Sequence, residues 1–186
     1  VNKNKLKFSE EIDLIFPSKI IDRHSYLMSK IYCEKLLELS GLKYIIVRPH
    51  NIYGPRMGFS HVIPELINKI KFEKKINVFS PYHSRAFCFI DDAIDQILKL
   101  NLQKKTLNNT FNIGNDSQEI KIIELARQLI KLMKSKKNIL KQKNSKGSPR
   151  RRCPNLNKIK KYIKLNKFSK LEDGLKKTIR WYSEYD

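Results

Sequence analysis

The sequence predicts an α/β protein, because short β-rich runs alternate with helical segments along its 186 residues. Residues 43–49 are a short β-rich run that ends in Pro49, and residues 109–114 read as a strand that ends in Gly114. The segments between and after them carry apolar residues every three or four positions, as helices do when one face packs on a core. No internal repeat or obvious linker divides the chain, so we expect strands and helices that belong to one fold.

Local signals place the elements in order. Gly41 is a candidate C-cap for the first helix, Pro49 stops the first strand, Pro64 fits the first turn of the second helix, and Asp92 is expected to cap the third. The expected elements are a loop (1–21), a helix (22–40), a buried strand (43–49), a loop (50–60), a helix (61–72), strands (76–80 and 85–90), a helix (91–102), a strand (109–114), a helix (120–134), a short strand (138–140), a short helix after Pro154 and a final helix (168–185).

Composition bounds the class of protein. The chain has 39 Lys and Arg against 18 Asp and Glu, a formal charge of +21. The cations are spread over every segment and no nucleic-acid-binding motif is present, so a nucleic-acid partner is not expected, although the positive field favours an anionic small substrate. The three cysteines lack a CxxC spacing and the histidines lack metal-ligand spacing, which predicts reduced thiols, a cytoplasmic location and no metal site. No apolar run is long enough to span a membrane.

Tyr26 and Lys30 are four residues apart on the expected helix and therefore share a face. A tyrosine acts as a base only as phenolate, which needs a positive charge nearby. An ammonium about 5 Å away stabilises a phenolate by ~3 kcal/mol at an effective dielectric near 20, but by less than ~1 kcal/mol in bulk water. The pair can therefore support proton abstraction only in a partly dry cleft. The same spacing also occurs often by chance.

Further segments give the pair a context. "RPHNIYGPR" (48–56), "RAFCFIDDAI" (85–94), "FNIGN" (111–115), "GSPRRRCPNLNKIKKYI" (147–163) and "LEDGLKKTIRWY" (171–182) follow it in order. Together they resemble the extended short-chain dehydrogenase/reductase family, the NAD-dependent nucleotide-sugar epimerases and dehydratases. The resemblance implies the C-terminal part of a Rossmann-like doubly wound parallel sheet plus a small α/β substrate-binding subdomain. It assigns residues 1–50 and about 80–115 mainly to the sheet, and about 51–79 and 116–186 mainly to the subdomain.

The resemblance also implies roles for particular residues. Tyr26 would be the catalytic base and Lys30 its partner, and both would contact NAD. The register between Arg151 and Arg152 is open, and Asn155 stands where the family often has Asp. The remaining candidates are Pro49 and Ile52 for the cofactor, and Asn51, His61, Arg85, Arg151, Arg152 and Asn155 for a UDP- or dTDP-sugar.

The six glycines form no Gly-rich phosphate-binding turn. We therefore expect a C-terminal portion of the family domain that depends on a separate N-terminal half, and the resemblance implies a homodimer through the Tyr–Lys helix. Epimerase, dehydratase and UDP-glucuronate decarboxylase chemistry all remain open, with "GPRM" leaning towards decarboxylases. A non-catalytic fragment or binding protein of the same fold is the alternative from another class.

Overall fold

The computed structural model describes residues 7–12, 18–145 and 147–184, so the expected loop at 1–21 lies partly outside the described residues. The helices are α1 (Asp22–Leu39), α2 (Val62–Phe72), α3 (Ile90–Asn101), the 3-10 turn η1 (Lys104–Thr106), α4 (Ile122–Leu132), α5 (Asn157–Tyr162) and α6 (Leu171–Glu184). The strands are β1 (Ile45–Pro49), β2 (Ile52–Tyr53), β3 (Ile76–Val78), β4 (Ser84–Ala86), β5 (Cys88–Phe89), β6 (Asn109–Ile113), β7 (Glu119–Lys121), β8 (Ile139–Lys141) and β9 (Arg151–Arg152).

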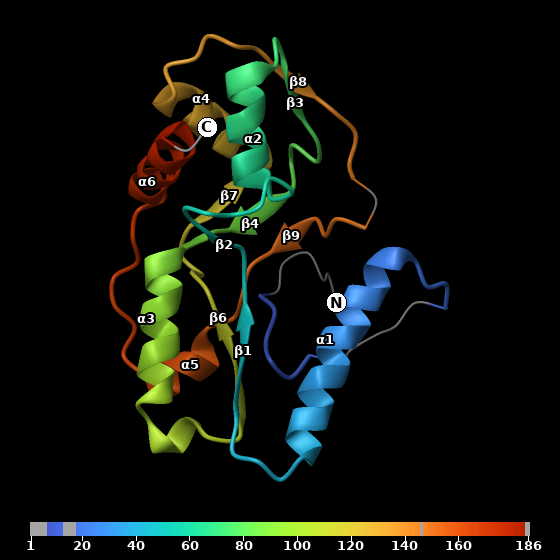
Figure 1. Cartoon of the computed structure of the whole chain (residues 1–186), viewed down its shortest axis with the longest axis vertical. Helices are drawn as coiled ribbons and strands as arrows, with labels where there is room; N and C mark the ends of the chain where they lie inside the picture. Colours follow the sequence, from blue (N-terminus) through green and yellow to red (C-terminus); the bar gives the residue numbers. More distant parts are fainter. Residues whose placement is uncertain (1–6, 13–17, 146, 185–186) are drawn as a thin grey trace.

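Most strand pairs are parallel, as the alternation of strands and helices predicts (Figure 1). β1 pairs with β6 from Ile45 opposite Asn109 to Pro49 opposite Ile113, and α3 packs beside the pair. β2 pairs with β5, and β3 with β8, also in parallel. β4 is central to a three-stranded sheet, antiparallel to β7 and parallel to β9. Among the described residues, the other edge of β1 has no strand partner.

Two hydrophobic cores hold these elements. The larger one joins α2, β3, α4 and α6 around Tyr53 and Phe89. The smaller one joins α5 to β6, where Phe111 and Ile113 are fully buried against Leu156 and Ile159. α5 therefore packs with the β1–β6 pair. The division of the chain into a sheet part and a subdomain stays a prediction.

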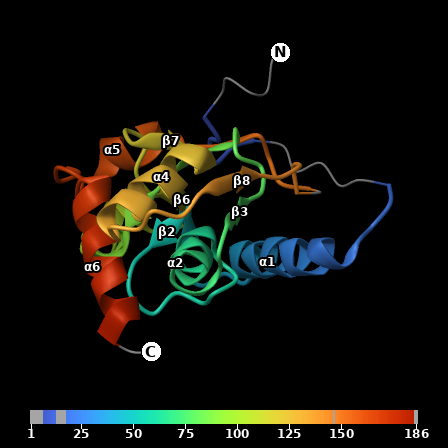
Figure 2. The same ribbon diagram turned by 90° about the horizontal axis from the view of Figure 1, so that it is seen from above.

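α1 stands to one side of β1, and Figure 2 shows it extending away from α2. A part-buried ion pair between Glu34 and Arg48 (2.6 Å) ties it to β1. Many of its apolar side chains are exposed: Leu27, Met28, Tyr32, Leu36 and Leu39. The C-cap of α1 is Ser40, one residue before the expected Gly41, and Gly41 follows it with a φ of +73°, the left-handed conformation usual just beyond a helix end.

Several expected elements differ in detail. Only Ile46 of β1 is buried, so the expected buried strand is mostly half-exposed. The run at 85–90 is not one strand, because its two ends pair with different neighbours: β4 with β7 and β9, and β5 with β2. Residues 119–121 form β7 rather than the start of α4. Asp92 does not cap α3, because its carboxylate accepts hydrogen bonds from the Ser169 backbone N–H and hydroxyl (both 3.0 Å).

Candidate functional site

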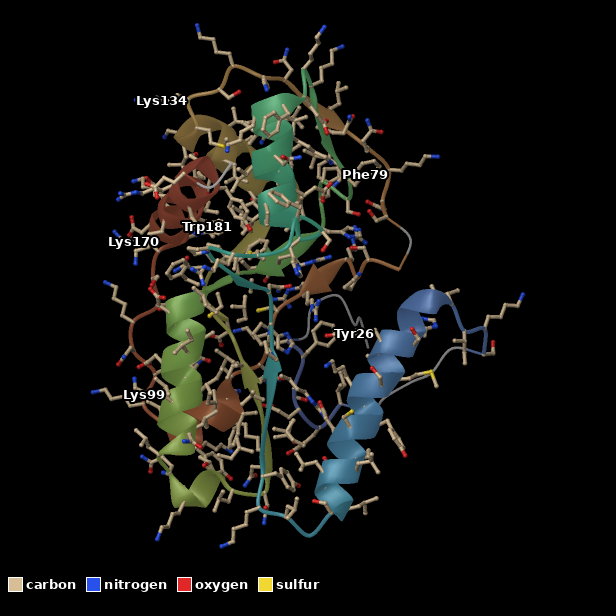
Figure 3. All side chains as sticks on the ribbon, in the orientation of Figure 1. Tyr26, Phe79, Lys99, Lys134, Lys170 and Trp181 are labelled. Atoms are coloured by element: carbon tan, nitrogen blue, oxygen red, sulfur yellow. The ribbon has the colours of Figure 1, made fainter. Side chains whose placement is uncertain are left out.

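The Tyr26–Lys30 pair lies on α1 as the spacing predicted. The Lys30 ammonium is 5.4 Å from the centre of the Tyr26 ring. Tyr26 is 70% exposed, and Figure 3 shows its side chain on the flank of α1 that is nearer β9 in that view. In this setting water screens the attraction between a phenolate and the ammonium. The ammonium thus lies over the tyrosine ring on an exposed helix face, without the dry surroundings that a phenolate base needs, and the catalytic role of the pair stays a prediction.

The carboxyl end of β1 leads into the turn that carries Asn51. Asn51 has a φ of +47°, a left-handed conformation that Asn tolerates better than most residues. Its side-chain amide donates to the Ala86 carbonyl (3.0 Å) and the Arg152 carbonyl (3.1 Å). Both donors expected to face a substrate phosphate are thus used to join β1 to β4 and β9. The phosphate role of Asn51 stays a prediction that requires one of these bonds to be exchanged.

The two cofactor candidates at this turn are placed by backbone pairing. Pro49 is the exposed last residue of β1, opposite Ile113. Ile52 begins β2 and pairs with Cys88. Both residues come after α1 in the chain. Among the described residues, α1 is ion-paired to one strand, β1, through Glu34 and Arg48. The nicotinamide contacts predicted for them stay predictions.

Residues 7–12 cross the ends of β1 and β6, which the sequence did not foresee. The Glu10 carboxylate accepts from the Asn112 backbone N–H (2.8 Å), and the Glu10 carbonyl accepts from Arg48 (3.0 Å). Phe8 forms a bridge to Pro154 and accepts at its carbonyl from the Asn112 side chain (2.9 Å). No periodicity marks this segment, because its order comes from these contacts with residues between 38 and 146 positions away along the chain.

His50 lies beneath this crossing. Its ring Nε2 is 3.1 Å from the Asn112 amide oxygen, and its Nδ1 is buried without a partner among the described residues. The pKa of His50 is lowered to about 4, mainly by burial and also by the charges of Arg152 and Arg48, against the opposing effect of the hydrogen bond with Asn112. The ring is therefore neutral at physiological pH.

Arg85 faces a cleft of about 280 Å³ between the start of α2, β3 and the segment before β9. Its guanidinium donates to the Ser84 carbonyl (2.7 Å) and to the Ser148 hydroxyl (2.9 Å). The cleft is lined by Ser60, Val62, Glu65, Leu66, Asn77, Val78, Phe79, Ser80, Arg85, Ile122, Ser145 and Ser148. A guanidinium among hydroxyls and an exposed aromatic ring suits an anion with a planar base.

The structure resolves the register of the two arginines in β9. Arg152 is opposite Arg85, whereas Arg151 is opposite Ser84. Opposite residues in paired strands point to the same face, so Arg152 shares a face with Arg85. Arg151 points to the other face and forms a two-pronged ion pair with Glu119 (2.7 and 2.8 Å). The hydrogen bond from Arg151 holds the pKa of the Glu119 carboxyl below its usual range.

The remaining candidates lie elsewhere. Asn155 accepts at its side-chain oxygen from the Asn157 backbone N–H (2.9 Å), which starts α5. It lines a second cleft of about 340 Å³ with Glu10, Lys158 and Lys161, apart from the Arg85 cleft. His61 is the exposed N-cap residue of α2, between the cleft-lining residues Ser60 and Val62. His61 thus adjoins the cleft that Arg85 lines, whereas Asn155 lines the other cleft.

Among the described residues, no group of His, Cys, Asp and Glu side chains could hold a metal ion. None of the helices described is both long and apolar enough to cross a bilayer.

Known proteins resemble this chain over most of its length. A decarboxylase of UDP-N-acetyl-alpha-D-glucosaminuronate from Bacillus cytotoxicus is 29% identical over 192 aligned positions, which cover 96% of this chain and 59% of that protein. A human dTDP-D-glucose 4,6-dehydratase is 28% identical over 172 positions, covering 86% of this chain and 48% of that protein. The chain thus spans about half the length of these relatives.

Solved structures share the fold. DesIV, a dTDP-glucose 4,6-dehydratase from Streptomyces venezuelae with NAD and TYD bound, matches with a TM-score of 0.79 at 20% identity, over 96% of this chain and 55% of that one. A UDP-glucuronic acid 4-epimerase from Bacillus cereus, in complex with UDP-glucuronic acid and NAD, matches at 0.76 and 21% identity, over 85% and 51%. The sequence model of the NAD dependent epimerase/dehydratase family matches residues 16–114, more than half of this chain, and the chain belongs to that family.

Proposed function

We propose that this chain carries the Tyr–Lys pair and the nucleotide-binding cleft of a cytoplasmic, NAD-dependent enzyme that acts on UDP- or dTDP-linked sugars. The observation that carries the proposal is the 5.4 Å approach of Lys30 to the Tyr26 ring, in a chain of the epimerase/dehydratase family. The relatives named above, which act on UDP- and dTDP-sugars, support the substrate class.

The chemistry follows from the two side chains. Tyr26, as phenolate, takes the proton of a sugar hydroxyl, and the Lys30 ammonium stabilises that phenolate. NAD, when bound, supplies the hydride acceptor for the carbon that bears the hydroxyl. The fate of the resulting keto sugar decides the overall reaction: reduction from the other face gives an epimer, loss of water a dehydrated sugar, and loss of a carboxylate a decarboxylated sugar.

The residues present fit one end of the cofactor. Tyr26 and Lys30 are exposed on α1, and Pro49 and Ile52 follow at the turn beyond β1, so these four residues would contact the nicotinamide end. None of the chain's six glycines forms the Gly-rich turn that holds a dinucleotide pyrophosphate. The pyrophosphate end therefore needs a Gly-rich half of the same domain.

The described surface has a place for such a half. β1 has an edge without a strand partner among the described residues. α1, which precedes β1 in the chain, exposes Leu36 and Leu39. α3, which packs beside the β1–β6 pair, exposes Leu98. A strand added to β1, with helices over these side chains, would bury them and exclude water from Tyr26. A homodimer through α1 stays a prediction.

A decarboxylase is the second candidate. The Bacillus cytotoxicus relative, a decarboxylase, aligns with 96% of this chain, and several relatives are UDP-glucuronic acid decarboxylases. A decarboxylase differs from an epimerase in releasing CO₂ from a uronic-acid substrate. The product therefore separates the two readings.

The test is reconstitution. The chain is mixed with, or fused to, the Gly-rich half of the Bacillus cytotoxicus relative, and NAD with UDP-glucose, dTDP-glucose or UDP-glucuronate is added. We expect NADH absorbance or a converted sugar with one of the three, and CO₂ only from UDP-glucuronate if the chain is decarboxylase-like. A well-folded complex that binds NAD and a nucleotide sugar yet converts none of them would identify a non-catalytic binding protein instead.

A further inference from the structure

Ser148 stands between a buried histidine and the arginine of the nucleotide cleft. Its hydroxyl oxygen is 2.9 Å from Arg85 Nη2 and 3.3 Å from His83 Nδ1. Arg85 and Ser148 both line the 280 Å³ cleft. The three side chains come from β4, the residue before it, and a segment more than sixty residues later in the sequence.

The direction of the hydrogen bonds follows from the donor inventory. A guanidinium only donates, so the Ser148 oxygen accepts from Arg85. That leaves the single hydroxyl hydrogen of Ser148 for another acceptor. His83 Nδ1 is such an acceptor when the ring is neutral and carries its hydrogen on Nε2. Burial lowers the pKa of His83, as do the nearby charges of Arg85 and Arg150, and this keeps the ring neutral.

Backbone contacts fix both ends of this chain of donors. The His83 carbonyl accepts from the first residue of α4, Ile122 (3.0 Å), and the His83 N–H donates to Ser80 (3.0 Å). Ser145 in turn donates its backbone N–H to the Ser80 hydroxyl (2.9 Å), and Ser148 donates its own to the Ser145 carbonyl (3.2 Å). Because His83 and Ser148 are both held through contacts with Ser80, the backbone fixes the position of the Ser148 hydroxyl.

We propose that Ser148 is a positioning residue for the substrate diphosphate: it accepts from Arg85, donates to His83 Nδ1, and so holds the guanidinium in the cleft. The inference rests on the proposed function, since it assigns the cleft to a nucleoside diphosphate. It adds His83 and Ser148 to the arginine. Without the hydroxyl, Arg85 keeps its bond to the Ser84 carbonyl but loses the hydrogen bond from its Nη2 to Ser148.

The experiment measures UDP binding to the whole chain by isothermal titration calorimetry. Ser148→Ala is expected to raise the Kd for UDP about tenfold, the effect of one lost hydrogen bond to a charged group. Ser148→Thr keeps the hydroxyl and is expected to restore binding to within about twofold of the original chain. Ser183→Ala, which removes an exposed hydroxyl on α6 that does not line the cleft, is the matched control for UDP binding.

A second measurement tests the Ser148–His83 hydrogen bond in the absence of a ligand. We call the Arg85–Ser148–His83 chain of hydrogen bonds the relay. Nitrogen-15 NMR of the histidine rings reports whether a ring nitrogen accepts a hydrogen bond. Ser148→Ala is expected to shift the His83 Nδ1 resonance towards that of a non-bonded nitrogen, and Ser145→Ala is expected to leave it in place. An unchanged resonance in Ser148→Ala would overturn the relay.

The two failures are distinguishable. If the original chain binds UDP and Ser148→Ala binds it equally well, the positioning role is wrong while the proposed function stands. If neither the original chain nor its assembly with the Gly-rich half binds UDP or dTDP, the assignment of the cleft fails, and the proposed function and the positioning role fail with it.

Discussion

Arg85 and Arg152 lie directly opposite each other across the parallel strands β4 and β9, so their side chains leave the same face of the sheet. Arg151, one residue earlier, leaves the opposite face and is engaged by Glu119. Two arginines on one face of the sheet make that face positive, which favours an anion there. This supports the proposed place of the substrate diphosphate next to Arg85.

Replacing the two β9 arginines tests that placement. We expect Arg152→Ala to weaken UDP binding roughly tenfold, because a charge on the Arg85 face is lost. Arg151→Ala should change UDP affinity by no more than about twofold, since that side chain points away. Calorimetric titration of both variants decides the point, and a larger loss in Arg151→Ala than in Arg152→Ala would reverse the register described here.

Gly174 allows α6 to pack against the larger core. A Cβ at this position would overlap the Tyr53 hydroxyl and lie 2.8 Å from the Phe89 ring. Gly174→Ala should therefore lower the free energy of unfolding by about 1–3 kcal/mol, the usual cost of overpacking. Gly58→Ala is the control, because only the Ser60 hydroxyl, 3.9 Å away, lies near its added Cβ. Urea unfolding of the two variants measures the difference, and equal stabilities would contradict this packing.

The order of helices and strands could be predicted from the sequence because the apolar residues of each helix recur at a helical period. α1, α2 and the short β8 were found within a few residues of their bounds. The two-residue strands β2 and β9 were missed, because their pairing depends on distant partners and no local pattern marks so short a strand. Register between neighbouring arginines could not be decided either, since β9 is too short to show alternation.

The candidate site was predictable only in part, for the same reason. A helical turn brings Tyr26 and Lys30 together, so their spacing was enough. The contacts of Asn51 with β4 and β9, and the relay from Arg85 through Ser148 to His83, depend on segments joined only by folding. Histidine and serine in a loop gave no signal of their own, because neither stands at a spacing that implies contact.

The Glu119–Arg151 pair predicts a pH dependence of stability. The pKa of Glu119 is lower in the folded chain than in the unfolded one, so its stabilising contribution is complete above the unfolded value, about 4.3. It is lost as pH falls through the lower, folded pKa. Glu119→Gln should therefore be less stable than the original chain at pH 7 and equally stable in acid below that folded value. Thermal melts across this range measure the gap, and a gap that persists unchanged in acid would contradict the assignment.

The exposed apolar side chains of α1 and α3 predict the behaviour of the chain by itself. The double variant Leu36→Glu with Leu98→Glu should make the isolated chain more soluble, because two exposed apolar side chains are replaced by charged ones. The same double variant should fail to bind the Gly-rich half, since those side chains would be buried on assembly. Light scattering and a pull-down with that half measure both effects, and Lys75→Glu, on the surface near β3, is the charge-matched control. Normal assembly of the double variant would place the contact elsewhere.

The most direct test removes one oxygen atom, the hydroxyl oxygen of Tyr26. In the assembly with the Gly-rich half, Tyr26→Phe is compared with Tyr32→Phe, another exposed tyrosine on the same helix. We predict that Tyr26→Phe lowers sugar conversion at least about a hundredfold while UDP binding stays intact, and that Tyr32→Phe converts sugar at the original rate. Equal conversion by the Tyr26→Phe assembly and the original would contradict the assignment of Tyr26 as the base.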